Sequence, residues 1–122
     1  MCKKILPLLS CLFLTTYVNA SSFFIVNNTA KTWTIMLNSI CSAQDGKNGI
    51  IKPYSQFNIP DLLLSSACKN LGCSADFYLS NKCQGTLVAN AEISMKKGVL
   101  AVSNYEPSYR VTFNSYTITI EQ

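Results

Sequence analysis

Short runs of alternating apolar and polar residues, separated by turn-forming residues, fill this chain from Ser22 to its end. The last run, YTITIE at residues 116–121, alternates without a break. Because successive side chains of a strand point to opposite faces, such runs are typical of strands that bury one face in a core. We therefore predict an all-β fold: an antiparallel, Greek-key-like β-sandwich of seven or eight short strands, with a small barrel as the alternative.

Turn residues set the boundaries of the predicted strands. Lys96-Lys97-Gly98 and Asn114-Ser115 are the clearest hairpin turns. Pro53 interrupts the segment 49–59, and because proline has no N–H to donate, we predict an edge strand there. The other strands are predicted at residues 22–27, 32–38, 75–80, 86–93, 99–104, 109–114 and 116–121, the first two being joined by residues 28–31.

The segment 60–72 departs from the alternation. Residues 61–68 (DLLLSSAC) predict a short helix with Leu62, Leu63 and Leu64 on its apolar side. A helix of two turns is marginal without packing. An irregular segment held by Cys68 and Cys73 is therefore an equal alternative.

The first twenty residues have the pattern of a Sec-type signal peptide. Lys3 and Lys4 precede an apolar stretch at residues 5–14, and Val18-x-Ala20 suits signal peptidase. That stretch is shorter than the about 20 apolar residues that span a bilayer. We predict a signal peptide at 1–20 cleaved after Ala20, one domain at 21–122, and a secreted or periplasmic protein with no stable membrane span.

Four of the six cysteines lie beyond the signal peptide: Cys41, Cys68, Cys73 and Cys83. An even number in an exported chain indicates two disulfides, which allows three connectivities. We favour Cys41–Cys68 with Cys73–Cys83, each contributing about 2–4 kcal/mol to stability. A zinc site of four cysteines usually contains closely spaced knuckle pairs, whereas Cys68 and Cys73 have four residues between them and Cys41 lies far upstream. We expect no metal and no cofactor.

The charge balance excludes one class of partner. Beyond residue 20 the chain has eight basic and six acidic residues, a net charge of +2. Nucleic-acid binding needs a clustered basic face, whereas the only adjacent bases are Lys96 and Lys97 at a turn. We expect a monomer that does not bind nucleic acid.

The chain contains no histidine, which excludes Ser–His and Cys–His nucleophiles and an imidazole base. Asp61, Asp76 and Glu92 are the carboxylates from which a glycoside hydrolase pair would be drawn. The more ordinary interpretation is that Asp61 caps a helical turn after Pro60, while the other two acids lie on a solvated face. We predict no catalytic residue.

The loop at residues 105–110 (YEPSYR) is the candidate binding site. Tyr105, Pro107, Tyr109 and Arg110 combine rigid aromatic area with a charged fork, as binding hot spots do. The alternative, which we favour, is that a tyrosine here packs over a strand corner. Residues 52–54 (KPY) have a similar composition and the same two interpretations.

Two resemblances follow from particular residues. FFIVNN at 23–28, then Trp33-Thr34-Ile35, resembles the opening hairpin of thaumatin-like proteins, and residues 50–59 are similar to their next strand. Those proteins are longer and richer in cysteine, and none of their cleft acids matches a motif here, so no site carries over. The leader, size and cysteines also resemble small disulfide-bonded proteins exported by Gram-negative bacteria, some by type II secretion.

These observations favour a secreted, non-enzymatic binding or effector module that recognises a protein or glycan through the loop 105–110. One alternative is an inhibitor of a secreted enzyme that uses residues 81–85 beside Cys83. A further alternative is a carbohydrate hydrolase that uses its carboxylates.

Overall fold

The protein is described by a computed structural model that covers residues 22–44, 46–68 and 72–122. The predicted signal peptide and cleavage site, at 1–20, lie outside the described residues and stay a prediction. Within the described part, no helix has the length and apolar character needed to cross a bilayer.

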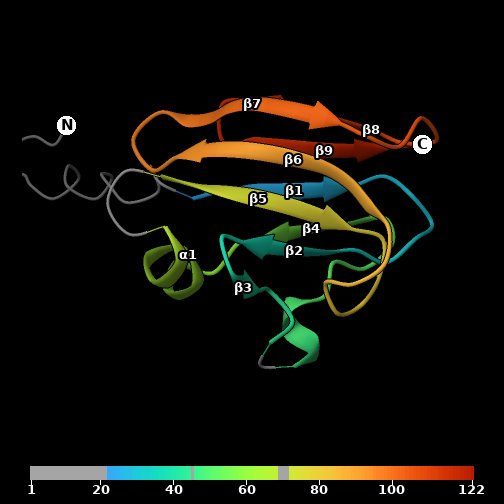
Figure 1. Ribbon diagram of the computed structural model, residues 1–122, viewed down its shortest axis with the longest axis horizontal. Helices are drawn as coiled ribbons and strands as arrows, with labels where there is room; N and C mark the ends of the chain where they lie inside the picture. The colour runs from blue at the N-terminus through green and yellow to red at the C-terminus, as the bar shows by residue number, and fades with distance from the viewer. Residues whose placement is uncertain (1–21, 45, 69–71) are drawn as a thin grey trace, which may run out of the picture.

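Nine strands of the described chain form two facing sheets (Figure 1). One sheet has the strand order β4-β1-β9-β8, and the other has the order β3-β2-β5-β6-β7. The predicted all-β sandwich is therefore confirmed. The strands are β1 (Phe24–Asn27), β2 (Thr34–Leu37), β3 (Ile40–Cys41), β4 (Ser55–Asn58), β5 (Gly72–Tyr78), β6 (Leu87–Ser94), β7 (Gly98–Asn104), β8 (Arg110–Asn114) and β9 (Thr117–Glu121).

The core lies between the sheets and is filled by the apolar halves of the alternating runs. Ile118 and Ile120 of β9 face Ile35 and Leu37 of β2 across this layer, and all four are fully buried. Trp33, just before β2, is the largest buried side chain. The alternation seen in the sequence therefore assigned the inward face of these strands correctly.

The predicted turns and edge agree with the pairing. Ser94 lies opposite Gly98 in the β6–β7 hairpin, and Asn114 lies opposite Thr117 in the β8–β9 hairpin. Strand β4, which follows Pro53, is an edge strand. These features depend on neighbouring residues, which is why the sequence revealed them.

Two features of the first strands were not predicted from the sequence. β1 and β2 do not form a hairpin, because residues 28–33 cross from one sheet to the other. The sandwich is also not wholly antiparallel, since β1 pairs in parallel with β9, with Ile25 opposite Ile118. Both departures have one cause: the chain inserts its first strand beside its last.

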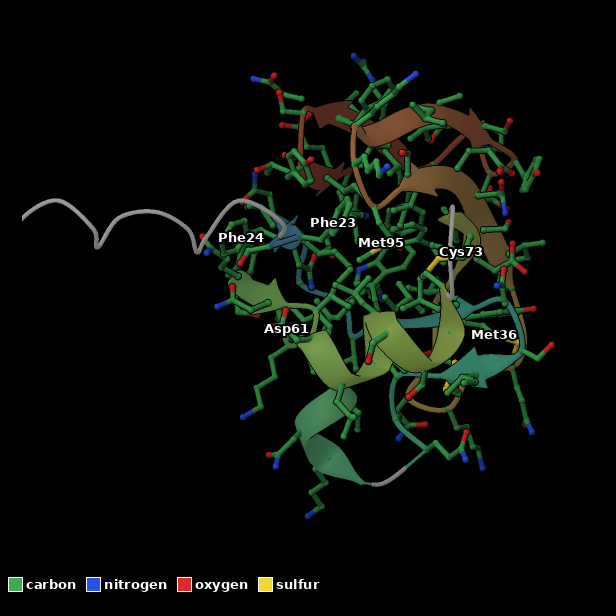
Figure 2. The ribbon with its side chains drawn as sticks, turned by 90° about the vertical axis from the view of Figure 1, so that its left-hand side faces the viewer. Phe23, Phe24, Met36, Asp61, Cys73 and Met95 are labelled. Carbon is green, nitrogen blue, oxygen red and sulfur yellow. A yellow bond between two sulfur atoms is a disulfide. The ribbon has the colours of Figure 1, made fainter. Side chains whose placement is uncertain are left out.

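The helix α1 (Asp61–Ala67) closes the end of the sandwich at which β5 begins (Figure 2). Leu64 and Ala67 are buried, whereas Leu62 is 77% exposed, so only part of the leucine run faces the core. The predicted capping role of Asp61 is wrong. Asp61 lies in the first turn, and the cap position is Pro60, which makes no side-chain hydrogen bond.

All four cysteines of the described chain form disulfides, but the favoured connectivity is wrong. The bridges are Cys41–Cys83 and Cys68–Cys73, with Cα–Cα distances of 6.0 and 4.9 Å. Cys73 lies near the start of β5, and Cys83 lies beyond its end at Tyr78. The five residues from Cys73 to the end of β5 at Tyr78 span roughly 16 Å, whereas a disulfide joins Cα atoms less than about 7 Å apart. Cys83, which follows the end of β5, is therefore not placed to bond to Cys73.

Candidate functional site

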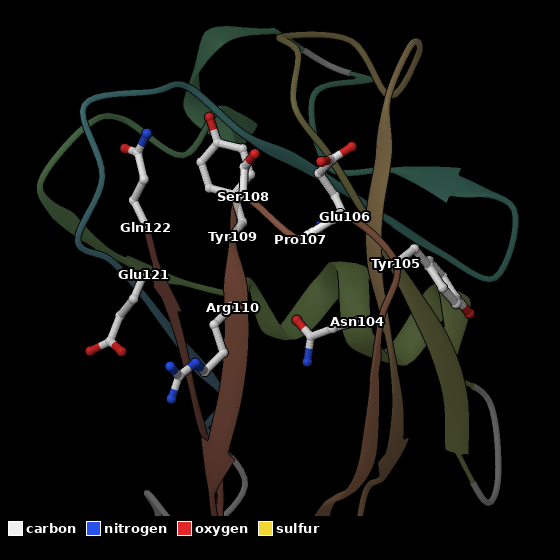
Figure 3. Close-up of a pocket in the computed structure, with 9 residues that line it drawn as sticks. All are labelled: Asn104, Tyr105, Glu106, Pro107, Ser108, Tyr109, Arg110, Glu121 and Gln122. Atoms are coloured by element: carbon white, nitrogen blue, oxygen red, sulfur yellow. The ribbon is translucent and has the colours of Figure 1, made fainter.

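The loop between β7 and β8 lies at the end of the sandwich opposite α1 (Figure 1). An open cavity of about 500 Å³ here is lined by residues 104–110, Glu121 and Gln122 (Figure 3). Tyr105, Pro107, Tyr109 and Arg110, the four predicted binding residues, therefore all line one cavity. We call this surface, residues 104–110 with 121 and 122, the pole site.

Asn104 fixes the base of the pole site. Its Nδ2 donates to the carbonyl of Val111 at 3.0 Å, and the Val111 N–H donates to its Oδ1 at 2.7 Å. The side-chain amide thus replaces a backbone pair between β7 and β8 where the two strands belong to different sheets. Within the loop, the Tyr109 N–H donates to the Glu106 carbonyl at 3.1 Å. The loop is held closed at its base and by a turn within it.

Tyr109 anchors the loop to the core. Its ring meets the ring of Trp33 edge to face, with centroids 5.0 Å apart and an interplanar angle of 89°. Such aromatic pairs contribute about 0.5–1.5 kcal/mol beyond the area that they bury. Trp33 is fully buried, and Tyr109 is half-buried. One tyrosine of this loop therefore packs against the core, as the interpretation favoured above expects.

A buried polar network beneath Tyr109 was not predicted from the sequence. Trp33 Nε1 donates to Thr29 Oγ1 at 3.0 Å, and that hydroxyl donates to Asn27 Oδ1 at 2.7 Å. Asn27 Nδ2 in turn donates to the carbonyls of Lys31 and Lys52, both at 2.8 Å. Side chains of this kind usually lie in exposed turns, so their residue types gave no sign of burial.

The network also positions the second candidate loop, residues 52–54. The Tyr54 N–H donates to the Thr29 carbonyl at 3.1 Å, and the Tyr54 side chain is 71% exposed. The loops 28–33, 52–54 and 105–109 therefore gather at one end of the sandwich around Trp33 (Figure 1). They are joined by hydrogen bonds and packing, although they are distant in sequence.

The groups that the pole site exposes are polar and of both charges. Tyr105 is 55% exposed, and Arg110 is exposed opposite Glu121 in the β8–β9 register. Figure 3 shows Tyr105 pointing away from Arg110 and Glu121. Among the described residues, no group of three or more acidic, cysteine or histidine side chains is placed to hold a metal ion. The chemistry on offer is hydrogen bonding, ionic contact and aromatic packing.

The structure brings together two of the three carboxylates considered for hydrolysis. Asp76 on β5 and Glu92 on β6 lie on the outer face of the five-stranded sheet, whereas Asp61 lies on α1. Asp76 accepts a hydrogen bond from Asn90 Nδ2 at 2.7 Å. Asp76 is half-buried and Glu92 is exposed.

The loop 81–85 folds over the outer side of β2. The Cys83 N–H donates to Thr34 Oγ1 at 2.9 Å, and the Cys41–Cys83 disulfide ties the loop to β3. This cover explains why Thr34, on the outward side of β2, is fully buried.

No family model matches this chain, and no curated protein matches it. Its fold is similar to that in the crystal structure of the type II secretion system substrate NttC from Legionella pneumophila. The TM-score is 0.63 at 15% sequence identity, and the match covers 84% of this chain and 97% of that one. The likeness is one of fold, and it agrees with the expected resemblance to small exported bacterial proteins. The thaumatin-like resemblance has no support.

Proposed function

We propose that this chain is an exported, non-enzymatic binding protein that recognises a protein or glycan partner through the pole site. The observation that carries the proposal is an exposed loop on a fixed base. Asn104 bonds to both backbone groups of Val111, while Tyr105 and Arg110 remain exposed beside an open cavity. A preformed loop loses little conformational entropy on binding.

The residue types at the pole site support this proposal. Tyrosine and arginine are among the residues that most often dominate binding energy, because they offer large contact area and several hydrogen bonds. Tyr109 is engaged with Trp33, so it supports the loop and leaves contact with the partner to Tyr105, Pro107 and Arg110.

Export is supported by three lines of argument. Disulfides persist in oxidising compartments, and the described chain contains two. The predicted signal peptide at residues 1–20 agrees with this interpretation. A solved structure with a similar fold is that of a type II secretion system substrate.

The side chains available support the non-enzymatic part of the proposal. The chain contains no histidine, and Cys41, Cys68, Cys73 and Cys83 are all bonded to one another in pairs. A hydroxyl or thiol nucleophile activated by imidazole is therefore ruled out.

Affinity capture tests the pole site directly. The oxidised protein is immobilised, exposed to cell lysates and to a glycan array, and compared with the Tyr105→Ala and Arg110→Ala variants. Loss of a hot-spot side chain costs more than about 1 kcal/mol. We expect each variant to retain roughly a tenth or less of the captured partner, equivalent to about 1.4 kcal/mol.

The matched control is Thr112→Ala, an exposed position on β8 outside the cavity, which should capture as the unaltered protein does. Near-ultraviolet circular dichroism confirms that all variants are folded. Equal capture by Tyr105→Ala, Arg110→Ala and the unaltered protein would reject the pole site.

The inhibitor alternative has one observation in its favour, because disulfide and hydrogen-bond anchoring of the loop 81–85 presents Lys82 from a rigid base. The same capture experiment separates the two functions. The inhibitor function would be favoured if the unaltered protein and Arg110→Ala capture a secreted enzyme that Lys82→Ala does not capture.

A further inference from the structure

The outer face of β5 and β6 carries a run of short polar side chains. Asp76 lies opposite Asn90, and Ser74 lies opposite Glu92. The intervening residues of both strands are buried, so these four side chains project away from the core. We call them the sheet-face track.

Hydrogen bonds within the track fix its central side chains. Asn90 Nδ2 donates to Asp76 Oδ1 at 2.7 Å and to Ser74 Oγ at 2.5 Å. Both amide hydrogens of Asn90 are thereby used, while its Oδ1 and the second oxygen of Asp76 keep their capacity to accept. Asp76 and Asn90 are half-buried, which restricts their rotamers further. The result is a set of acceptors held at fixed positions on a flat surface.

A groove continues the track toward the β6–β7 turn. This cavity of about 660 Å³ is lined by Ser74 and Glu92 of the track, and also by Lys96, Lys97 and Leu100. The two lysines add donors to a surface that otherwise offers acceptors. Tyr78 is half-buried and follows Asp76 by two residues on β5, so it lies at the end of the track away from the groove. Ser74 and Tyr78 are four residues apart, a span of roughly 13 Å along the strand.

We propose that the sheet-face track binds a saccharide, with Asp76 and Asn90 accepting hydrogen bonds from neighbouring hydroxyls. Sugar hydroxyls are closely spaced and act as both donors and acceptors, which matches fixed carboxylate and amide oxygens beside lysine donors. At Asp76 and Asn90, away from the two lysines, phosphate-bearing ligands fit less well because the Asp76 carboxylate repels them.

This site is separate from the pole site, and its residues take no part in the proposed function. The test uses the whole oxidised protein and a panel of neutral oligosaccharides (gluco-, manno-, galacto- and chito-oligomers), first on an array and then by titration calorimetry. We expect at least one panel member to bind. Asn90→Ala and Asp76→Asn should each weaken that binding at least tenfold.

The matched control for Asn90→Ala is Asn58→Ala, an exposed asparagine on the outer face of the other sheet. It should bind as the unaltered protein does. Asp76→Asn preserves the size of the side chain, so it stays informative if a truncation unfolds the protein. The absence of binding to every panel member, or binding unchanged in both track variants, would overturn the proposal.

The calorimetry sample is also analysed for newly formed reducing ends. Cleavage of a bound oligosaccharide would contradict the non-enzymatic function proposed above, while still supporting a saccharide site. If the capture experiment rejects the pole site while oligosaccharide binding still depends on Asn90 and Asp76, the proposed function fails and the saccharide site is supported.

Discussion

Thr29 shows how a single buried hydroxyl organises one end of this protein. Its Oγ1 accepts from the Trp33 indole and donates to Asn27, and all three side chains are essentially inaccessible to solvent. A buried polar group that loses its partner costs far more than an exposed one, because no water replaces the bond. The support of the pole site therefore depends on buried residues that lie outside it.

We expect Thr29→Val to lower the free energy of unfolding by about 1–3 kcal/mol, because valine has a similar shape but leaves Trp33 Nε1 without a partner. Urea denaturation, followed by the fluorescence of the single tryptophan, measures this change. The control is Thr112→Val on the exposed face of β8, with an expected change within about 0.5 kcal/mol. Equal midpoints for the two variants would contradict a structural role for the network.

The helix α1 illustrates how an element depends on its packing. Seven residues cannot form a stable helix alone, since nucleation outweighs the few hydrogen bonds gained. Burial of Leu64 and Ala67 against the end of the sandwich supplies the missing stabilisation. The run of three leucines in the sequence did not indicate that Leu64 is buried and Leu62 is exposed.

Leu64→Ala should lower the free energy of unfolding by about 2–5 kcal/mol, because it removes a buried side chain and leaves a cavity. Leu62, which is 77% exposed on the same helix, provides the control. Leu62→Ala should change the free energy of unfolding by less than about 0.5 kcal/mol. Thermal and urea unfolding of the two variants under identical conditions make the comparison. Similar losses for both would show that the helix packs in another orientation.

The two disulfides act at different ranges across the whole molecule. Cys41–Cys83 joins residues 42 apart in sequence and fastens the β5–β6 loop over β2, whereas Cys68–Cys73 closes a separation of 5. A bridge that closes a longer loop removes more conformational entropy from the unfolded chain. The long-range bridge is therefore expected to dominate stability.

Replacing Cys41 and Cys83 together by alanine should cost about 4 kcal/mol of unfolding free energy, against about 2 kcal/mol for the Cys68/Cys73 pair, on the chain-entropy relation. Chemical denaturation of the two double variants measures both values. Non-reducing peptide mapping of the unaltered protein checks the pairing itself. The reverse order of stability, or a Cys73–Cys83 peptide, would contradict this account.

The sequence by itself determined the features that arise from neighbouring residues. Alternation identified the described strands except the two-residue β3, Pro53 marked an edge, and the turn residues marked two hairpins. The composition of the loop 105–110 identified residues that line one cavity. Each of these signals is local, because strand periodicity and turn preferences are set over a few residues.

Only the tertiary structure decided what depends on contacts between distant segments. Segments far apart in sequence meet in the parallel pairing of β1 with β9 and in the disulfide between Cys41 and Cys83. The same holds for the crossing of residues 28–33 from one sheet to the other. It also separated the two tyrosines of the pole site, since Trp33 engages Tyr109 and leaves Tyr105 exposed. Such pairings are selected by burial and shape across the whole fold, and no local pattern encodes them.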